Sequence, residues 1–271
     1  MSKQAIIITV IIVYIIIRSL IIEPGSIKIT RYEVESNELS GVKAVFLSDL
    51  HLKRQDYKRL DRIIDLTNSE APDIVFFGGD FAKYTDKKKN MKVENLAARL
   101  TYIRAPKYAV LGDDDWHSNY NEYMTQLKKN KITVLENNAV RTVVRGRYLD
   151  IIGLKDITMK DVNITKAMKR TKMPRVVLTH NPDIYYDVLD DVTLILAGHT
   201  HGGQIVIPMT APLFVPSRYG AQFSSGLKTP KDNKIIISKG LGTDKFPARL
   251  NCKPEIVVIE FIRNGSGRNT R

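Results

Sequence analysis

The chain has 271 residues, 43% of them hydrophobic, which is enough to bury one large core or two small ones. Its single cysteine, Cys252, excludes an internal disulfide. The formal net charge of +13 favours an anionic partner such as nucleic acid, a lipid surface or a phosphorylated substrate.

The first element is an apolar segment over residues 5–22, AIIITVIIVYIIIRSLII, in which Arg18 is the only charge. Its length approaches the ~20 residues of a membrane-spanning helix, and the lack of a polar face argues against a buried core helix. A cleaved signal peptide is disfavoured because RSLIIEPGS has no pair of small residues before a cut site. We expect a membrane anchor over residues 1–22, one domain over 23–262 and a disordered basic tail over 263–271, with the membrane face left open.

Short apolar runs alternate with amphipathic segments in the domain. The runs that predict buried strands are residues 42–47, 73–77, 108–111, 149–153, 175–179 and 192–197. Apolar residues at helical spacing predict crossover helices over residues 56–68 and 93–103. Beyond Gln204, the runs IVI, KIIIS and EIVVIEF predict further strands. This order predicts an α/β fold with sheets in the middle and helices outside.

Acidic residues and histidines follow five of the predicted strands. In chain order they are Asp49 and His51, Asp80, the three carboxylates of LGDDDWH (Asp113, Asp114 and Asp115), His180, and finally His199 and His201. A single Asp after a strand is usually a turn or a helix cap, but four of the five histidines fall at these ends. Ligand crevices border the carboxyl ends of strands in open α/β sheets. Imidazole and carboxylate groups together predict a dinuclear site for Mn, Fe, Zn, Ni or Co.

These motifs resemble one family. Asp49-x-His51, GGD ending at Asp80, GDDD, THNPD around His180 and GHTH are together similar to the calcineurin-like metallophosphoesterases. GHTHGGQ, VPSRYG and SKGLGTDKFPARLNCKPEI further resemble the membrane-anchored bacterial branch of that family. The resemblance implies a four-layer α/β/β/α sandwich with two central mixed sheets.

The resemblance also implies roles for individual residues. Asp49, His51 and His201 would hold one divalent ion, Asp113, His180 and His199 a second, and Asp80 would bridge them, while a hydroxide on the metals attacks phosphorus. Gly112 and Gly198 are expected to let the backbone turn tightly beside the ions. Arg218 and Lys245 lie in the family-like C-terminal segment. They are candidate ligands of the substrate phosphate, with exposed surface cations as the alternative.

The sequence departs from the family motif at two positions. Asp113 stands where the family has Asn, and Asp114 stands where it has a His that protonates the leaving group. Asp114, with an ordinary pKa of ~3.9, is poorly suited to that task beside two cations. The candidate catalytic residues in this motif are nevertheless Asp114, Asp115 and His117. The last of these could supply an imidazole, although a surface position at the start of a helix is the simpler interpretation of His117.

Two further interpretations of the altered motif stay open. In one, the leaving group needs no proton, as in the UDP-diacylglucosamine pyrophosphatases of lipid A synthesis, which resemble this family and carry Arg instead of the His. In the other, the protein binds metal without turnover.

We expect a membrane-anchored dinuclear-metal hydrolase of phosphodiester or pyrophosphate bonds in a lipid-linked or nucleotide-linked substrate. No nucleic acid partner is expected, since the sequence has an anchor and no run that interleaves aromatic with basic residues. The oligomeric state is left open.

Overall fold

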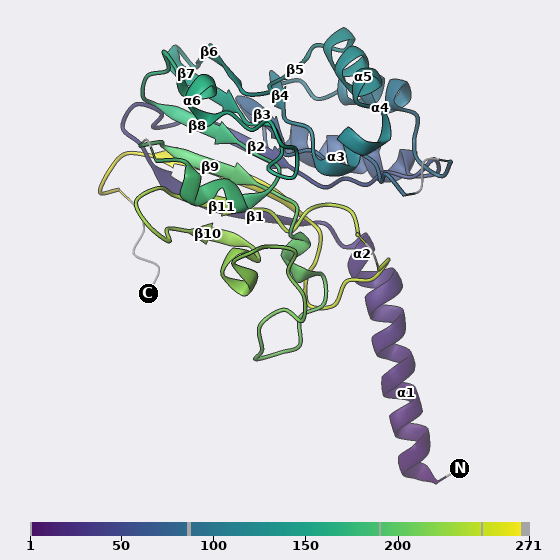
Figure 1. Ribbon diagram of the computed structural model, residues 1–271. Coiled ribbons are helices and arrows are strands. Elements are labelled where there is room, and N and C mark those ends of the chain that lie inside the picture. Colours follow the sequence, from purple (N-terminus) through teal and green to yellow (C-terminus); the bar gives the residue numbers. More distant parts are fainter. Residues whose placement is uncertain (1, 86–87, 190, 245, 267–271) are drawn as a thin grey trace.

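Two six-stranded mixed sheets form the centre of the domain in the computed structural model (Figure 1), which describes residues 2–85, 88–189, 191–244 and 246–266. The first sheet contains, in spatial order, β1 (Lys28–Glu35), β12 (Glu255–Ile262), β2 (Lys43–Leu47), β3 (Ile74–Phe77), β4 (Lys107–Ala109) and β5 (Ile132–Val134). The second contains β10 (Gly226–Lys228), β11 (Ile235–Ile237), β9 (Leu194–Ala197), β8 (Arg175–Leu178), β7 (Arg147–Gly153) and β6 (Asn138–Val144).

Most neighbouring strands in both sheets are parallel. In the first sheet, β2, β3, β4 and β5 run parallel, while β12 is antiparallel to β2 and parallel to β1. In the second sheet, β7, β8, β9 and β11 run parallel, and the edge strands β6 and β10 are antiparallel. Because parallel strands end at the same edge of a sheet, the loops that follow them gather there.

Side chains alternate between two apolar layers along each central strand. In β2, Phe46 faces the core between the sheets, whereas Val45 packs toward the helices α3 (Tyr57–Ser69), α4 (Val93–Leu100) and α5 (Asp113–Lys129). In β7, Ile151 faces the same central core, and Ile152 packs toward α6 (Ile164–Met168) and the 3₁₀ helix η2 (Pro182–Asp187). Three buried layers therefore separate four structural layers, which confirms the predicted α/β/β/α sandwich.

The observed elements differ from the predicted ones in a few places. β4 ends at Ala109, since the next residues turn into α5. The sequence predicted only the start of a helix at His117 and not its extent to Lys129. The run IVI at residues 205–207 was wrongly predicted as a strand, because only Ile205 forms an isolated bridge, with Leu250. Ile207 is exposed and therefore lacks the buried face that stabilises a strand. β1, β5, β6 and β10 were also not predicted.

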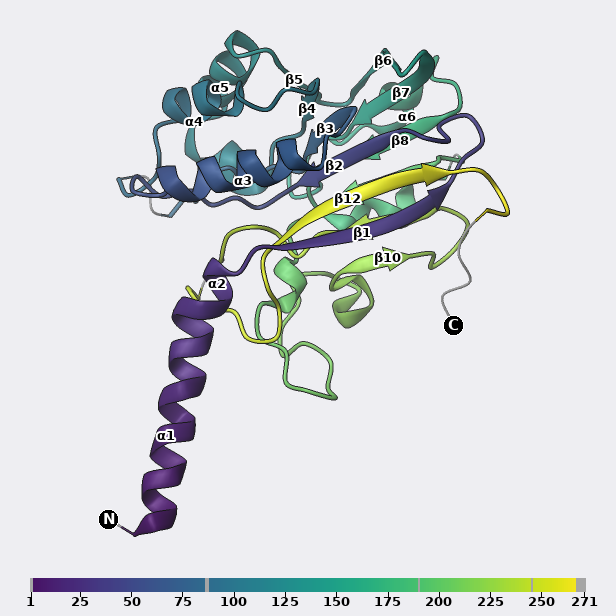
Figure 2. The same cartoon turned by 180° about the vertical axis from the view of Figure 1, so that it is seen from behind.

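A continuous helical segment over Lys3–Gly25 projects from the domain (Figures 1 and 2) and comprises α1 (Lys3–Ile17), the π-helical η1 (Arg18–Ile22) and α2 (Glu23–Gly25). It is the one helix among the described residues that is long and apolar enough to cross a membrane. Its base is tied to the domain: Arg18 donates to Asn251 at 2.7 Å, and Glu23, which pairs with Arg18 within the segment, accepts from the backbone N–H of Cys252 at 3.2 Å.

Candidate metal centre

The seven side chains predicted as ligands lie close together where the carboxyl-terminal strand ends of the two sheets meet. Asp49 and His51 follow β2, Asp80 follows β3, Asp113 begins α5, His180 follows β8, His199 follows β9, and His201 begins the short helix η3 (His201–Gly203). They form groups whose ligand atoms all lie within 4.8 Å of one another. Each sheet contributes to each group, so the centre exists only when both sheets are assembled.

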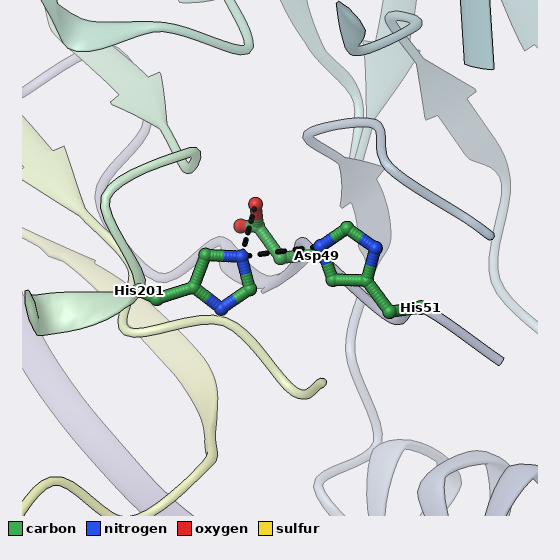
Figure 3. A group of neighbouring side chains, drawn as sticks. All are labelled: Asp49, His51 and His201. Atoms are coloured by element: carbon green, nitrogen blue, oxygen red, sulfur yellow. Dashed lines mark hydrogen bonds and ion pairs between the residues drawn. The ribbon is translucent and has the colours of Figure 1, made fainter. Parts of the chain in front are cut away.

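The first group consists of Asp49, His51 and His201 (Figure 3). Nε2 of His51 lies 3.1 Å from Nε2 of His201, which in turn lies 3.4 Å from Oδ1 of Asp49. The two imidazole rings are nearly parallel, with centroids 5.0 Å apart. Two facing ring nitrogens beside a carboxylate need a proton or a cation between them.

The second group consists of Asp113, His180 and His199. Oδ1 of Asp113 lies 3.2 Å from Nε2 of His180 and 3.4 Å from Nδ1 of His199, and these two nitrogens are 3.2 Å apart. Among the described residues, this buried oxygen of Asp113 has no hydrogen-bond partner. The three ligand atoms thus point at one common position.

Asp80 lies between the two groups. Its Oδ2 is 3.6 Å from Nε2 of His51 and 3.5 Å from Nε2 of His180, so one oxygen faces both groups. Its Oδ1 accepts a hydrogen bond of 3.1 Å from the backbone N–H of Asp114. This contact fixes the carboxylate in the bridging orientation.

The donor atoms fit divalent cations. Two ligands that each lie about 2.1 Å from one cation, at tetrahedral or octahedral angles, are themselves about 3.0–3.4 Å apart. Five of the six separations within the two groups are 3.1–3.4 Å, and the sixth, between Asp49 and His51, is below 4.8 Å. Nδ1 of His180 donates to the carbonyl of Gly78 at 2.7 Å, which leaves Nε2 free to ligate. The residues present therefore match the cations that their chemistry implies.

Burial sets the protonation of the cluster. It raises the pKa of Asp49 and Asp80 and lowers the pKa of His51 and His201 well below its usual range. Burial opposes the charging of His180, but the carboxylates around it, Asp80 foremost, raise its pKa well above the usual value. His51 and His201 are thus neutral, the form that binds metal, and a cation would replace the proton on His180.

Five of the seven residues adopt left-handed backbone conformations that residues other than glycine rarely adopt. The φ angles are +53° at Asp49, +43° at His51, +55° at Asp80, +68° at His199 and +52° at His201. Such strain collects at functional sites, where the surrounding structure over-determines it. The strand ends are therefore shaped to aim these side chains inward.

Two glycines allow the cluster to close. A Cβ atom on Gly112 would lie 2.1 Å from Oδ1 of Asp80, and one on Gly198 would lie 2.4 Å from Oδ2 of Asp49. Both glycines were expected from the sequence to permit tight turns. Gly112 has a φ of −88°, which any residue can adopt, so what it provides is space for a ligand carboxylate.

The three candidate catalytic residues occupy different environments. Asp114 is partly exposed, and its Oδ2 lies 3.5 Å from Nδ1 of His51. Asp115 is fully buried behind the ligands, where burial raises its pKa to about 7. Its carboxylate accepts the backbone N–H groups of Gly112, Asp80 and Phe81 at 2.8–3.1 Å, so it positions loops. His117 is exposed in the first turns of α5.

Two residues, Arg218 and Lys245, were predicted to bind the substrate phosphate. The Arg218 side chain is 68% exposed, with Nε 3.9 Å from Oδ2 of Asp183, so its role in substrate binding stays a prediction. Lys245 lies outside the described residues.

Arg249 was not predicted from the sequence, although it is fully buried beside the first group. Its guanidinium donates to the carbonyls of Lys239 at 2.7 Å and Cys252 at 3.0 Å, and its Nη2 lies 3.4 Å from Nδ1 of His201. It thereby ties the C-terminal loops to His201. The sequence offered one sign of this burial, namely that Arg249 is flanked by the apolar residues Ala248 and Leu250.

The fold and the facing ligand groups define a metal-dependent phosphoester hydrolase. Residues 42–203 match the calcineurin-like phosphoesterase family, and the chain belongs to that family.

Sequence relatives and a solved structure support the assignment of the chain to this family. The chain is 28% identical to phosphodiesterase YaeI of Escherichia coli (strain K12) over 247 residues, which cover 89% of this chain and 90% of the relative. It is 30% identical to the uncharacterized metallophosphoesterase YkoQ of Bacillus subtilis (strain 168), covering 79% and 82%. The crystal structure of a 5'-nucleotidase precursor from Thermus thermophilus shares the fold, with a TM-score of 0.50, 15% identity and coverage of 80% and 54%.

Proposed function

We propose that the protein is a membrane-anchored hydrolase of phosphodiester or pyrophosphate bonds that works with two divalent cations. The observation that carries this proposal is the position of Asp80, whose Oδ2 faces His51 at 3.6 Å and His180 at 3.5 Å. A single bridging oxygen between two sets of ligands is the arrangement that a pair of cations requires. Mn, Fe, Zn, Ni and Co all accept these ligands.

Bound cations would lower the pKa of water at the site and neutralise the charge on the phosphoryl oxygens. The residues of the chain keep the ligands in place for this chemistry. Asp115 fixes the loops of Asp80 and Gly112, the carbonyl of Gly78 orients His180, and the backbone N–H of Asp114 holds Asp80. Because burial and backbone contacts fix the ligands beforehand, little reorganisation is needed when substrate binds.

The helical segment Lys3–Gly25 supports the anchoring part of the proposal, since none of the residues of α1 (Lys3–Ile17) is buried by the domain. A relative from Danio rerio, described as a transmembrane protein with metallophosphoesterase domain, is 25% identical over 82% of this chain and 53% of its own length. The net charge of +13 suits a lipid-linked or nucleotide-linked anionic substrate at a bilayer. Each Lys or Arg side chain near an anionic bilayer surface contributes about 1 kcal/mol to the free energy of binding.

Asp114 favours a pyrophosphate as the second candidate substrate, as in a UDP-diacylglucosamine pyrophosphatase. Its carboxylate stands where the family has the leaving-group acid. A pyrophosphate releases a phosphate that is stable as an anion, and the reaction then needs no acid at this position.

Hydrolysis and metal content test the proposal together. Detergent-solubilised full-length protein is loaded with Mn and offered an aryl phosphodiester and a nucleotide-sugar pyrophosphate. We expect two Mn per chain and hydrolysis of at least one substrate, both lost in Asp80→Asn and retained in Asp65→Asn, which changes an exposed carboxylate on α3. Two bound Mn without hydrolysis of either substrate would instead support a metal-binding relative without turnover.

A further inference from the structure

An apolar pocket of about 190 Å³ opens directly beside the first ligand group. Its lining includes His201 together with Ile205, Leu213, Phe214 and Phe246. The volume is slightly larger than the ~150 Å³ cavity that holds a benzene molecule. The pocket therefore fits a short length of hydrocarbon next to the metal centre.

Large apolar side chains are exposed at three residues that line this pocket, Leu213, Phe214 and Phe246, and at Ile207 and Met209 in the chain segment between its lining residues. The exposed fractions are 44% at Ile207, 105% at Met209, 66% at Leu213, 59% at Phe214 and 66% at Phe246. We call residues 205–216 together with Phe246 the docking segment. Clustered exposed hydrophobic residues of this kind mark surfaces that contact a partner or a membrane.

The docking segment is connected to the base of the N-terminal helix by hydrogen bonds. Asn251 accepts from Arg18 at 2.7 Å and donates to the carbonyl of Val206 at 2.8 Å. The backbone N–H of Arg249 donates to the carbonyl of Ser19 at 2.8 Å. Figures 1 and 2 show the segment after His201 projecting from the domain on the side from which α1 leaves. The docking segment and the apolar helix therefore leave the domain on the same side.

We propose that the docking segment enters the bilayer surface and that the pocket behind it takes an alkyl chain of a membrane lipid whose phosphoester lies at the metal centre. This inference rests on the proposed function and adds the substrate class, a lipid rather than a soluble nucleotide. The bilayer is the occupant because the segment is continuous with the base of the apolar helix. His201 belongs both to the pocket and to the first ligand group, so a chain in the pocket brings its phosphate to the ligands.

The depth of the docking segment tests the first half of the proposal without any substrate. Met209→Cys is labelled with a fluorescent dye in the full-length protein and placed in phosphatidylcholine vesicles that contain spin-labelled lipid. Cys252 is buried and does not compete for the dye. We expect lipid spin labels to quench the dye at position 209 but not at Tyr148→Cys, a 67% exposed residue on β7. Equal exposure to water at both positions would overturn the proposal.

Chain-length dependence tests the second half. The full-length protein in phosphatidylcholine nanodiscs is given methyl and octyl p-nitrophenyl phosphodiesters. We expect kcat/KM to rise by up to about fourfold for each methylene that the pocket buries. The double variant Leu213→Ser, Phe214→Ser is expected to reduce the octyl-to-methyl ratio at least tenfold, whereas Tyr148→Ser keeps it. Comparing variants in the same nanodiscs cancels the partitioning of the substrates.

The outcomes separate this inference from the proposed function. Failure to hydrolyse any diester or pyrophosphate, with the dye at position 209 still quenched by lipid, would reject the hydrolase and keep the membrane-docking surface. Hydrolysis with an octyl-to-methyl ratio that the double variant leaves unchanged would keep the hydrolase and reject the alkyl-chain pocket.

Discussion

Oδ2 of Asp114 lies 3.5 Å from Nδ1 of His51, while Nε2 of the same imidazole is the atom in the first ligand group. Nδ1 is buried and has no hydrogen-bond partner among the described residues. A histidine that ligates through Nε2 carries its proton on Nδ1, and a carboxylate commonly holds that proton and orients the ring. Asp114 therefore occupies the place of a residue that orients a ligand.

Removing the Asp114 carboxylate should weaken metal binding. We expect Asp114→Ala to lower Mn affinity by about 10- to 100-fold, and Asp114→Asn to retain most of it, because the amide oxygen takes the place of the carboxylate oxygen that lies 3.5 Å from Nδ1 of His51. Competition against a chelator of known affinity measures the change. Asp65→Ala, on the exposed face of α3, serves as the control. Unchanged affinity in Asp114→Ala would assign Asp114 to another task.

Gly112 should tolerate no side chain. Its Cβ would lie 2.1 Å from Oδ1 of Asp80, so Gly112→Ala must displace the bridging carboxylate. We expect Gly112→Ala to fold but to hold fewer than two Mn per chain and to lose at least 100-fold in hydrolysis. Circular dichroism and metal analysis check this. Gly25→Ala is the control, since nothing lies within 4 Å of its Cβ. Full metal content in Gly112→Ala would show that Asp80 does not need this space.

Asp115 should stabilise the metal-free protein. Three backbone N–H groups lose their side-chain acceptor in Asp115→Ala, which we expect to cost about 1–3 kcal/mol in the free energy of unfolding. Urea denaturation in the presence of a chelator measures this, with Asp65→Ala again as the control. Loss of hydrolysis with no loss of stability or metal content would contradict the positioning role and support the predicted catalytic one.

The ion pair between the buried Asp150 and the exposed Arg141 should make stability depend on pH. Burial opposes ionisation of Asp150, but hydrogen bonds from Arg141 at 2.6 and 2.8 Å and from the backbone N–H of Lys172 outweigh it and lower the pKa. A lowered pKa stabilises the folded protein above the unfolded value of ~3.9. The stabilisation is lost as the pH falls through the lower folded value.

Asp150→Asn provides the measurement of this effect. We expect the variant to be less stable than the wild type at pH 7, and the difference to shrink at pH 3. Urea denaturation with a chelator at both pH values checks the prediction, since any bound metal is then absent from both proteins. A difference that stays constant between pH 7 and pH 3 would show that the loss arises from packing.

The ligand set could be predicted because each residue follows a recognisable apolar strand, and the geometry of parallel sheets does the rest. The different roles of the three adjacent carboxylates could not be predicted, since nothing in the sequence DDD distinguishes one Asp from the next. Their tasks follow from α5, in which successive residues point about 100° apart. Of the three carboxylates only Asp115 is buried, and the other buried residues of α5 are Tyr123 and Leu127, which follow the kink at Asn119.

Long-range pairing explains two of the remaining failures. β1 is only partly buried, and its partner β12 lies more than 200 residues away in sequence. The buried Arg249 lies 3.4 Å from His201, which precedes it by 48 residues. Local pattern carries no information about such partners.

The order β1-β12-β2 in the first sheet has a consequence for biosynthesis. β12 lies between the two strands that the ribosome makes first, and all eight residues of β1 pair with it. If the helix anchors the chain as proposed, it can enter the bilayer while the place of β12 is still vacant, because translation proceeds from the N-terminus. The partly synthesised domain would then be held at the membrane with two unpaired strand edges, which are templates for aggregation. Synthesis of residues 255–262 completes the sheet, so folding of the domain is a late event in the synthesis of the chain.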